Sequence, residues 1–289
     1  MFKVKKLNFT YPKNKQRTIK DITFTIKEGE IFGFLGPSGA GKSTTQKILI
    51  KLLQDYNGNI SFLNHDLKSL DYNYYEDIGV GFEMPVHFSK LTALENLHFF
   101  QGLYNKRIDL EPILKSLALW EHRNKLVSKY SKGMKVRLNF IRAILNQPKV
   151  LFLDEPTNGL DPVNAKIIKD HIKQFNHNGG TVFITSHNMR DIEELCDRVA
   201  FIVDGEIKEI DSPKNLKYKY GTHTVKVEYL NQELLISKEF PLHNLGENEE
   251  FIKILKNNKI KTIHSGESTL EDIFIKITGV SLDHDEEVL

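Results

Sequence analysis

The feature that constrains this chain most is a glycine-rich segment that joins an apolar run to an amphipathic one. The apolar run, Glu30 to Leu35, has the pattern of a buried parallel strand, and Thr45 to Leu53 has the pattern of an amphipathic helix. The residues between them follow the order that a phosphate-binding loop requires: Gly36, Pro37, Ser38, Gly39, Ala40, Gly41, Lys42, Ser43 and Thr44. The chain is therefore expected to hold a nucleotide phosphate.

Each residue type in this loop has a physical role in holding an anion. Gly36, Gly39 and Gly41 have no Cβ, so we expect the backbone there to take positive φ and to wrap closely around a phosphate. The helix that begins near Lys42 adds the positive end of its dipole, and the Lys42 ammonium reaches the β- and γ-phosphates. The Ser43 hydroxyl is an oxygen ligand of the kind that Mg²⁺ prefers.

Two further strands are expected to end at the same site. Val150 to Leu153 is an apolar run followed by Asp154 and Glu155, as in a central parallel strand whose carboxyl end faces a ligand. Asp154 is then placed to hold hydrated Mg²⁺, and Glu155 to orient and deprotonate an attacking water. The strand Thr181 to Thr185 leads to His187, which can hydrogen-bond a terminal phosphate, although a lone histidine there fits a structural role better.

The N-terminal part has the alternating pattern of antiparallel strands. Residues 2 to 11 and 18 to 29 alternate apolar and polar side chains, and a basic loop joins them. Tyr11 stands at the end of the first of these strands, ahead of the phosphate loop. Its ring can stack on adenine, although most tyrosines in such positions only pack against neighbours.

Composition narrows the class of protein further. The 289 residues are 40% hydrophobic and 27% charged, which is typical of a globular protein, and the formal net charge of +2 gives no argument for a nucleic-acid partner. No run of apolar residues is long enough to span a membrane, and the first residues lack the apolar core of a signal peptide. The single cysteine fits a reducing compartment, so we expect a cytoplasmic location.

The order of these patterns predicts an α/β fold of the P-loop NTPase type. It has a mostly parallel core sheet, an antiparallel β subdomain, a helical insertion and a small C-terminal α+β appendage. We expect a nucleotide-binding domain over residues 1–212, with the helical subdomain at about 84–133. A lysine-rich linker is expected over 213–222, and an accessory domain with an acidic tail over 223–289.

Taken together, these motifs resemble the nucleotide-binding subunit of ATP-binding-cassette (ABC) transporters over nearly all of residues 1–212. The most specific piece is the stretch from Tyr130 to Met134, which is similar to the signature motif usually written Leu-Ser-Gly-Gly-Gln. In that family the serine and the second glycine, here Ser131 and Gly133, contact the γ-phosphate held by the opposite subunit. Tyr11 then matches the adenine-stacking aromatic, and Asp161 belongs to a stretch similar to the dimer-contact loop.

One departure from the family pattern concerns the metal. The loop glutamine that touches Mg²⁺ and links the site to the membrane partner is replaced here by Glu83. A carboxylate is a harder, charged ligand, so the resemblance implies that Glu83 joins Ser43 and Asp154 around the metal with altered coupling. The alternative is that Glu83 is an ordinary loop residue.

The resemblance implies a protein that binds ATP and Mg²⁺ and dimerises around ATP, either with itself or with a sister ATPase subunit. Glu155, His187 and Lys42 are then the catalytic residues. The stretch Leu270 to Gly279 is similar to the C-terminus of cassettes that serve ABC-2-type exporters, which implies a separate membrane permease and a place on the inner face of the cell membrane.

Two alternative functions remain, namely a soluble cassette ATPase acting on ribosomes or DNA, and a regulatory cassette that only binds nucleotide. The cargo stays open.

Overall fold

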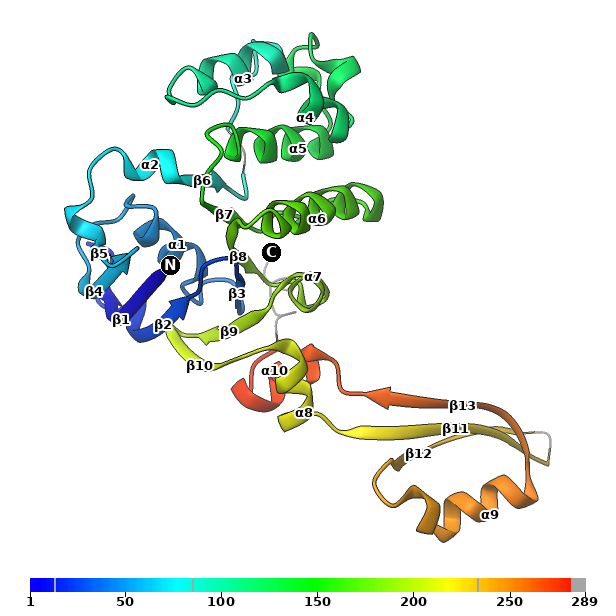
Figure 1. Cartoon of the computed structure of the whole chain (residues 1–289). Helices are drawn as coiled ribbons and strands as arrows, with labels where there is room; N and C mark the ends of the chain where they lie inside the picture. Colours follow the sequence, from blue (N-terminus) through cyan, green and yellow to red (C-terminus); the bar gives the residue numbers. More distant parts are fainter. Residues whose placement is uncertain (13, 85, 233, 282–289) are drawn as a thin grey trace. The chain divides into compact units, whose positions relative to one another are not determined.

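The computed structural model describes residues 1–12, 14–84, 86–232 and 234–281. These residues fall into two compact units, Met1–Asp211 and Ser212–Ser281 (Figure 1). The phosphate loop and every residue predicted to contact nucleotide or metal belong to the first unit.

The centre of the first unit is a six-stranded sheet in the order β10-β9-β3-β8-β7-β6. Neighbouring strands from β9 to β6 run parallel, whereas β10 runs antiparallel to β9. The strands are β3 (Ile31–Leu35), β6 (Ile78–Gly81), β7 (Val150–Asp154), β8 (Thr181–Ser186), β9 (Arg198–Val203) and β10 (Glu206–Asp211). All residues of β3 and β7 are buried, because helices and a second sheet cover the core sheet, and this explains their continuous apolar runs.

The second sheet is antiparallel and has the order β2-β1-β4-β5. Its strands are β1 (Phe2–Phe9), β2 (Ile19–Ile26), β4 (Asn57–Phe62) and β5 (His65–Asp66). Aromatic side chains join the two sheets: the ring centroids of Phe2 and Phe152 lie 5.7 Å apart, and those of Phe24 and Phe32 lie 5.6 Å apart. The alternation seen in the sequence arises because one face of this sheet packs on the core.

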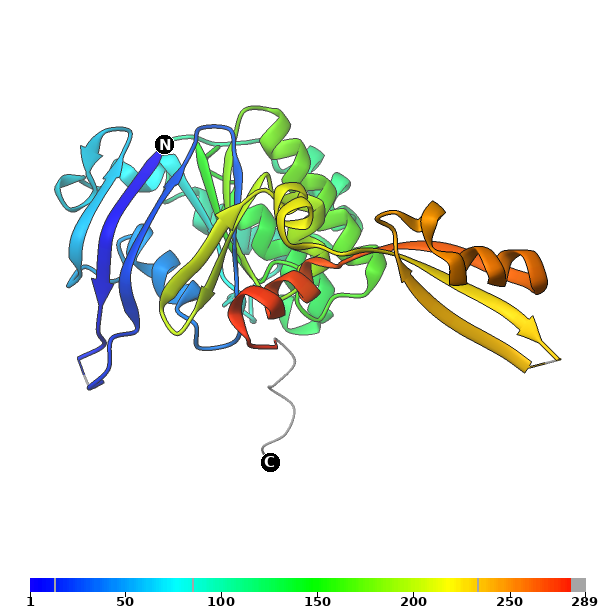
Figure 2. The same cartoon turned by 90° about the horizontal axis from the view of Figure 1, so that it is seen from below.

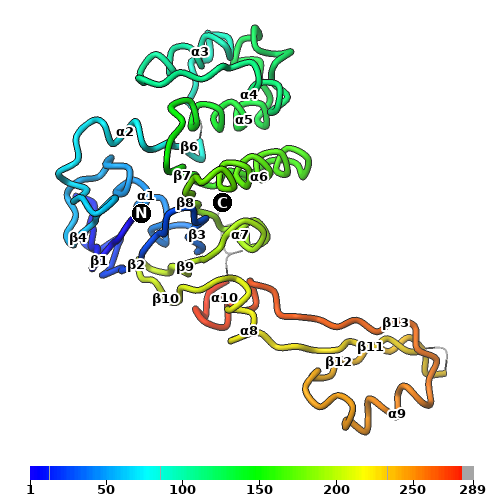
Figure 3. Tube along the Cα trace, viewed as in Figure 1, coloured from blue at the N-terminus to red at the C-terminus, as the bar shows by residue number. Residues whose placement is uncertain are grey.

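The helices of the first unit connect the core strands. They are α1 (Lys42–Leu49), α2 (Tyr74–Asp77), α3 (Ala93–Gln101), α4 (Leu110–Ser116), α5 (Lys132–Ala143), α6 (Pro162–His177) and α7 (Met189–Leu195), with short 3₁₀ turns η1 (Leu67–Ser69), η2 (Trp120–His122) and η3 (Val127–Lys129). The chain leaves the core after β6, passes through α3, α4 and α5, and returns at β7 (Figure 3). Between β6 and β7 the described residues contain no strand apart from an isolated bridge between Thr92 and Leu126.

The second unit is a three-stranded antiparallel sheet with helices. Its elements are α8 (Pro213–Tyr220), β11 (His223–Asn231), β12 (Leu234–Pro241), η4 (Leu245–Glu247), α9 (Glu249–Asn257), β13 (Lys259–Glu267) and α10 (Leu270–Thr278). The sheet order is β12-β11-β13, and α9 covers one of its faces (Figure 2). Val227, Phe240 and Phe251 are buried between this helix and the sheet.

One detail of the expected domain plan is wrong. Most of the linker expected over 213–222 is helix α8, which belongs to the second unit. The Ser212 side chain accepts a hydrogen bond from the Asn215 backbone N–H at 3.1 Å and caps this helix, and Leu216 is buried. The sequence looked like a linker because the exposed face of α8 carries lysines. The expected acidic tail, Asp283 to Leu289, lies outside the described residues.

The predicted fold class is confirmed: the first unit combines a mostly parallel sheet, an antiparallel sheet and helices in the P-loop NTPase arrangement. The boundaries proposed for the helical subdomain and the accessory domain remain predictions. Within the described part of the chain, no helix has both the length and the apolar character that crossing a bilayer demands.

Candidate functional site

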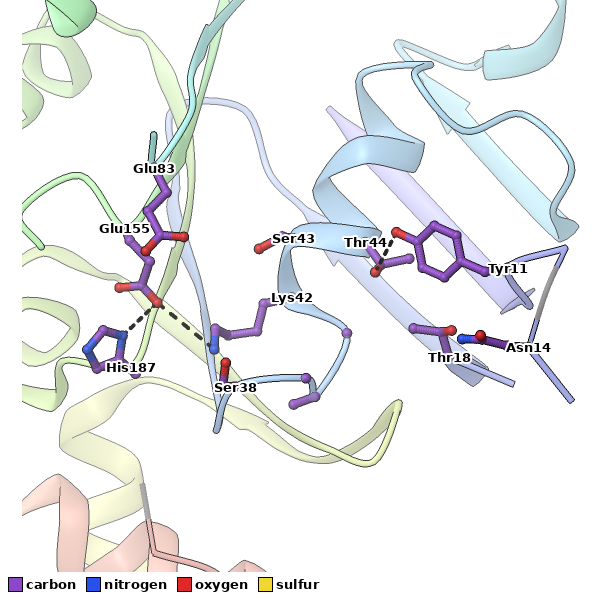
Figure 4. Close-up of a pocket in the computed structure, with 13 residues that line it drawn as sticks. Tyr11, Asn14, Thr18, Ser38, Lys42, Ser43, Thr44, Glu83, Glu155 and His187 are labelled. Atoms are coloured by element: carbon purple, nitrogen blue, oxygen red, sulfur yellow. Dashed lines mark hydrogen bonds and ion pairs between the residues drawn. The ribbon is translucent and has the colours of Figure 1, made fainter. Parts of the chain in front are cut away.

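A cavity of about 790 Å³ lies at the carboxyl edge of the core sheet, beside the glycine-rich loop (Figure 4). Residues from five parts of the chain line it: Tyr11, Asn14, Thr18, Ser38, Gly39, Ala40, Gly41, Lys42, Ser43, Thr44, Glu83, Glu155 and His187. They meet there because β3, β7 and β8 are parallel neighbours, so their carboxyl ends share one edge of the sheet. Asn14 and Thr18 were not predicted, since nothing in the pattern around them differs from an ordinary loop.

The loop glycines serve two different purposes. Gly39 and Gly41 have φ of +76° and +104°, as expected for a loop that turns its N–H groups toward an anion. Gly36 does not have positive φ, so that expectation is wrong for this position. A Cβ on Gly36 would instead lie 2.1 Å from the carbonyl oxygen of Ile202 in β9. Glycine is required there because two backbones approach closely.

Lys42 is the first residue of α1 and is almost completely buried. Its ammonium donates hydrogen bonds to the carbonyl oxygens of Gly36 at 2.6 Å and Pro37 at 3.1 Å, and lies 4.0 Å from the Glu155 carboxylate. The buried Lys42 ammonium is therefore held by the backbone of the same glycine-rich loop. A phosphate that enters the loop can take the place of these carbonyl acceptors.

Ser43 and Asp154 bring two oxygen ligands together. The Ser43 hydroxyl donates to Asp154 Oδ1 at 3.0 Å, and Thr185 also donates to Asp154. In the described part of the chain, no group of three or more His, Cys, Asp or Glu side chains is arranged so that it could hold a metal ion. One hydroxyl and one carboxylate fit Mg²⁺, which keeps waters and substrate phosphates as its other ligands, better than an ion that needs a complete protein cage.

The Glu155 carboxylate follows β7 and is held by three neighbours. Its Oε1 lies 2.9 Å from His187 Nδ1, and its Oε2 accepts a hydrogen bond from the Ser186 hydroxyl at 3.1 Å. Burial raises the pKa of Glu155, while the hydrogen bond from His187 and the nearby Lys42 charge lower it by less. A buried carboxylate with a raised pKa beside a histidine is suited to accept a proton from water.

At the other end of the cavity lies Tyr11, as Figure 4 shows. Its hydroxyl is 3.2 Å from the Thr44 hydroxyl, and its ring stands edge-on to Phe9 with centroids 4.9 Å apart. The ring therefore borders the space beyond the phosphate loop, and the Asn14 and Thr18 side chains lie near it. This arrangement leaves room for a nucleobase at the end of the cavity opposite Glu155.

Glu83 lines the same cavity. Its Oε1 accepts a hydrogen bond from the Asn158 side-chain amide at 3.1 Å. Asn158 lies in the loop between β7 and α6, so Glu83 connects the loop after β6 with the loop after β7. No sequence pattern predicts this bond, because the two residues are far apart in the chain.

The remaining predicted residues lie outside the cavity. Ser131 and Asp161 each cap a helix: the Ser131 side chain accepts from the Met134 N–H at the start of α5, and Asp161 accepts from the Val163 and Asn164 N–H groups at the start of α6. A Cβ on Gly133 would lie 3.3 Å from the Asn164 side chain, so the two helix starts are close together. Within one chain, none of Ser131, Gly133 and Asp161 lines the cavity described above.

The order of the core strands and the loop at their carboxyl ends place the first unit among the P-loop nucleotide hydrolases. A family model described as ABC transporter matches residues 19–158. A second model, described as fluoroquinolone efflux ABC transporter C-terminal domain, matches residues 223–267. The chain belongs to the ATP-binding subunits of ABC transporters, and it is an ABC ATPase.

Relatives support this membership over the full length. A fluoroquinolones export ATP-binding protein of Mycobacterium tuberculosis is 46% identical over 284 residues, which is 98% of this chain and 94% of the relative. The bacitracin transport ATP-binding protein BcrA of Bacillus licheniformis is 32% identical over 96% of this chain and 97% of its own length.

Solved structures agree on the fold. A structure described as the ATP binding subunit of an ABC transporter has a TM-score of 0.69 and 26% identity, and the match covers 76% of this chain and 93% of that one. A dimeric post-hydrolysis structure of the ATP-binding cassette MJ0796, bound to ADP and Pi, has a TM-score of 0.66 and 27% identity over 73% of this chain and 98% of that one.

Proposed function

We propose that this chain is the ATP-hydrolysing subunit of an exporter, that it dimerises around ATP, and that it drives a separate ABC-2-type membrane permease. The observation that carries the proposal is the convergence of Lys42, Glu155 and His187 on one cavity while Ser131 lies outside it. A second subunit is then needed to bring Ser131 and Gly133 to the γ-phosphate. Asp161 lies in the loop expected to contact that subunit.

The roles of the residues follow from their positions. The loop N–H groups and Lys42 bind the β- and γ-phosphates, and Tyr11 stacks on adenine. Glu155 orients a water in line with the γ-phosphate and accepts its proton, and His187 holds the Glu155 carboxylate in place and bonds the terminal phosphate. Ser43 and Asp154, with Glu83 nearby, would hold Mg²⁺, which when bound neutralises charge on the phosphate oxygens.

A groove on the first unit offers a surface for the permease. It has a volume of about 740 Å³ and is lined by residues of α1, β6, α3 and the loop that carries Glu83. Met84, Val86 and Leu103 in this groove are 81%, 79% and 66% exposed, which is unusual for large apolar side chains. An amphipathic helix of the permease fits such a groove, and its binding would place this chain on the inner face of the cell membrane.

The substrate class rests on the relatives. A 46% identical relative is named for fluoroquinolone export, and the second unit matches a C-terminal domain described for fluoroquinolone efflux. We therefore propose a fluoroquinolone as the cargo. The names of these relatives favour a transporter over an ATPase that acts on ribosomes or DNA, and the intact set of Lys42, Asp154, Glu155 and His187 favours hydrolysis over nucleotide binding alone.

The test is transport by the complete complex. The chain is purified with the membrane protein that co-purifies with it, and the complex is placed in vesicles with this chain outside. We expect ATP-dependent accumulation of a fluoroquinolone and loss of nearly all accumulation and hydrolysis in Glu155→Gln. Full ATPase activity in Glu155→Gln would contradict the catalytic assignment. Intact hydrolysis with accumulation of bacitracin but no fluoroquinolone would show that only the cargo is wrong.

A further inference from the structure

A small polar network is formed by Thr157, Asp191 and Lys169, none of which lines the cavity. The Thr157 hydroxyl donates a hydrogen bond to Asp191 Oδ2, and Asp191 Oδ1 lies 3.2 Å from the Lys169 ammonium. Thr157 belongs to the loop between β7 and α6, Lys169 lies on α6 and Asp191 on α7. Thr157 and Asp191 are 8% and 9% exposed, so water does not replace either partner easily.

The network joins the two segments that carry the residues around the attacking water. Thr157 follows Glu155 by two residues, and the Asn158 N–H donates to the Glu155 carbonyl at 3.1 Å, so the loop turns directly after the carboxylate. Helix α7 begins two residues after His187. Asp191 therefore links the loop after Glu155 with the helix that follows His187.

The backbone of Glu155 shows why this loop needs support. Its φ is +47°, in the left-handed region that a side chain with a Cβ rarely occupies. Such a conformation persists only where the surrounding structure holds it. The Glu155 N–H donates to the Thr185 carbonyl on one side at 3.0 Å, and the Thr157 side chain bonds Asp191 on the other.

Asp191 has a partner on each side, the Lys169 ammonium and the Thr157 hydroxyl. A buried carboxylate without a partner is costly, and Lys169 supplies the opposite charge. Glu194, one turn further along α7, also pairs with Lys169 and with Lys173, but 41% of its side chain is exposed and it does not contact Thr157. Glu194 is therefore a matched control: it shares the helix and the lysine with Asp191, but not the hydrogen bond to the catalytic loop.

We propose that Asp191 is a positioning residue for ATP hydrolysis and that it acts through Thr157 to hold Glu155 within reach of His187. The proposal rests on the function proposed above for Glu155. Asp191 does not line the cavity, so its effect is on the geometry of the carboxylate and not on nucleotide binding.

The experiment compares variants of the full chain in steady-state ATP hydrolysis. Thr157→Val removes the hydroxyl with little change of volume, and Thr157→Ser keeps it. We expect Thr157→Val to lower kcat by roughly 10- to 100-fold with KM for ATP within about twofold of the unaltered protein. Thr157→Ser is expected to recover most of kcat, and Glu194→Gln to keep kcat within about twofold.

Thermal unfolding is measured for every variant, and Thr157→Ala replaces Thr157→Val if the valine variant does not fold. The proposal is overturned if the folded variant without a hydroxyl keeps full kcat, if Glu194→Gln loses as much as that variant, or if the loss appears in KM alone. Glu155→Gln distinguishes a failure of the proposed function from a failure of the role proposed for Asp191. Hydrolysis retained in Glu155→Gln contradicts the proposed function, whereas loss in Glu155→Gln together with full activity in Thr157→Val contradicts only the role of Asp191.

Discussion

Glu155 combines a buried carboxylate, a histidine partner and a left-handed backbone in one residue. Burial makes ionisation of this group less favourable, and the surrounding donors offset only part of that cost. A carboxylate in this state is a better base than one in water, and at the same time it destabilises the fold. The same burial therefore supports the catalytic role proposed for Glu155 and lowers the stability of the folded state.

This link predicts a pH-dependent effect of Glu155→Gln in the nucleotide-free protein. Because the folded state raises the pKa of Glu155 above its ordinary 4.5, the folded state binds the proton more tightly than the unfolded state. The ionised carboxylate thus costs stability fully at pH above the raised value, and this cost disappears as the pH falls below about 4.5. We expect Glu155→Gln to raise Tm at pH 8 relative to the unaltered protein, with a smaller difference at pH 4.5.

The control for this measurement is Glu194→Gln, measured by the same thermal unfolding. Hydrogen bonds from Lys169 and Lys173 lower the pKa of Glu194, so its ionised form stabilises the fold above its unfolded pKa. Its replacement is expected to lower Tm at pH 8, opposite in sign to Glu155→Gln. The same sign in both variants would contradict the assigned environments.

At the scale of elements, several of the predicted site residues lie at the start of a helix. Helix α1 begins at Lys42, after Gly41 with φ of +104°, and ends before Lys51, which has φ of +61°. The expected start near Lys42 agrees with this, whereas the amphipathic pattern runs on to Leu53, beyond the last helical residue Leu49, because apolar periodicity marks the face of a helix better than its ends. Helices α5 and α6 begin with the capping residues Ser131 and Asp161, which are also the residues expected at the second subunit.

Ser131 has two roles that substitution can separate: it caps α5, and it is proposed to contact the nucleotide of the second subunit. Ser131→Ala removes the acceptor for the Met134 N–H and is expected to lower the free energy of unfolding by about 1 kcal/mol. Ser131→Asn restores a cap but places a different group toward the partner's nucleotide. We expect thermal unfolding to show a loss only in Ser131→Ala, and steady-state hydrolysis to fall in both variants. Full ATPase activity in Ser131→Asn would mean that Ser131 is only a helix cap.

At the scale of the whole molecule, the cavity of one chain contains the phosphate loop and the proposed base but not the signature residues. A dimeric cassette structure at 27% identity shares the fold of the first unit. If Glu155 is the base, Glu155→Gln binds ATP without turnover, and we expect this variant to form dimers with Mg²⁺ and ATP and to remain monomeric without nucleotide. Light scattering after size-exclusion chromatography measures the molar mass of each variant.

The control is a double variant that combines Glu155→Gln with Ser131→Ala and is expected to stay monomeric. Equal dimer content in the single and the double variant would contradict a nucleotide site shared between two subunits.

Much of this architecture could be predicted because local patterns carry it. Continuous apolar runs identified β3 and β7, alternation identified β1 and β2, and Asp154 with Glu155 stood at the end of a buried strand. The motifs alone indicate the family. For α8 the sequence predicts a linker instead, because few of its side chains are apolar, and only the cap and the burial of Leu216 show that it is a helix of the second unit.

The sequence by itself determined the class of fold, the phosphate loop and the identity of the proposed catalytic residues, because each depends on a short, contiguous pattern. Only the tertiary structure decided how these residues are held. The contact of Gly36 with Ile202, the bond between Glu83 and Asn158, and the network of Thr157, Asp191 and Lys169 join residues that are distant in the chain. The glycine-rich loop can thus be identified from its own sequence, whereas its close packing on β9 and the geometry of Glu155 beside it depend on contacts with β8, α6 and α7.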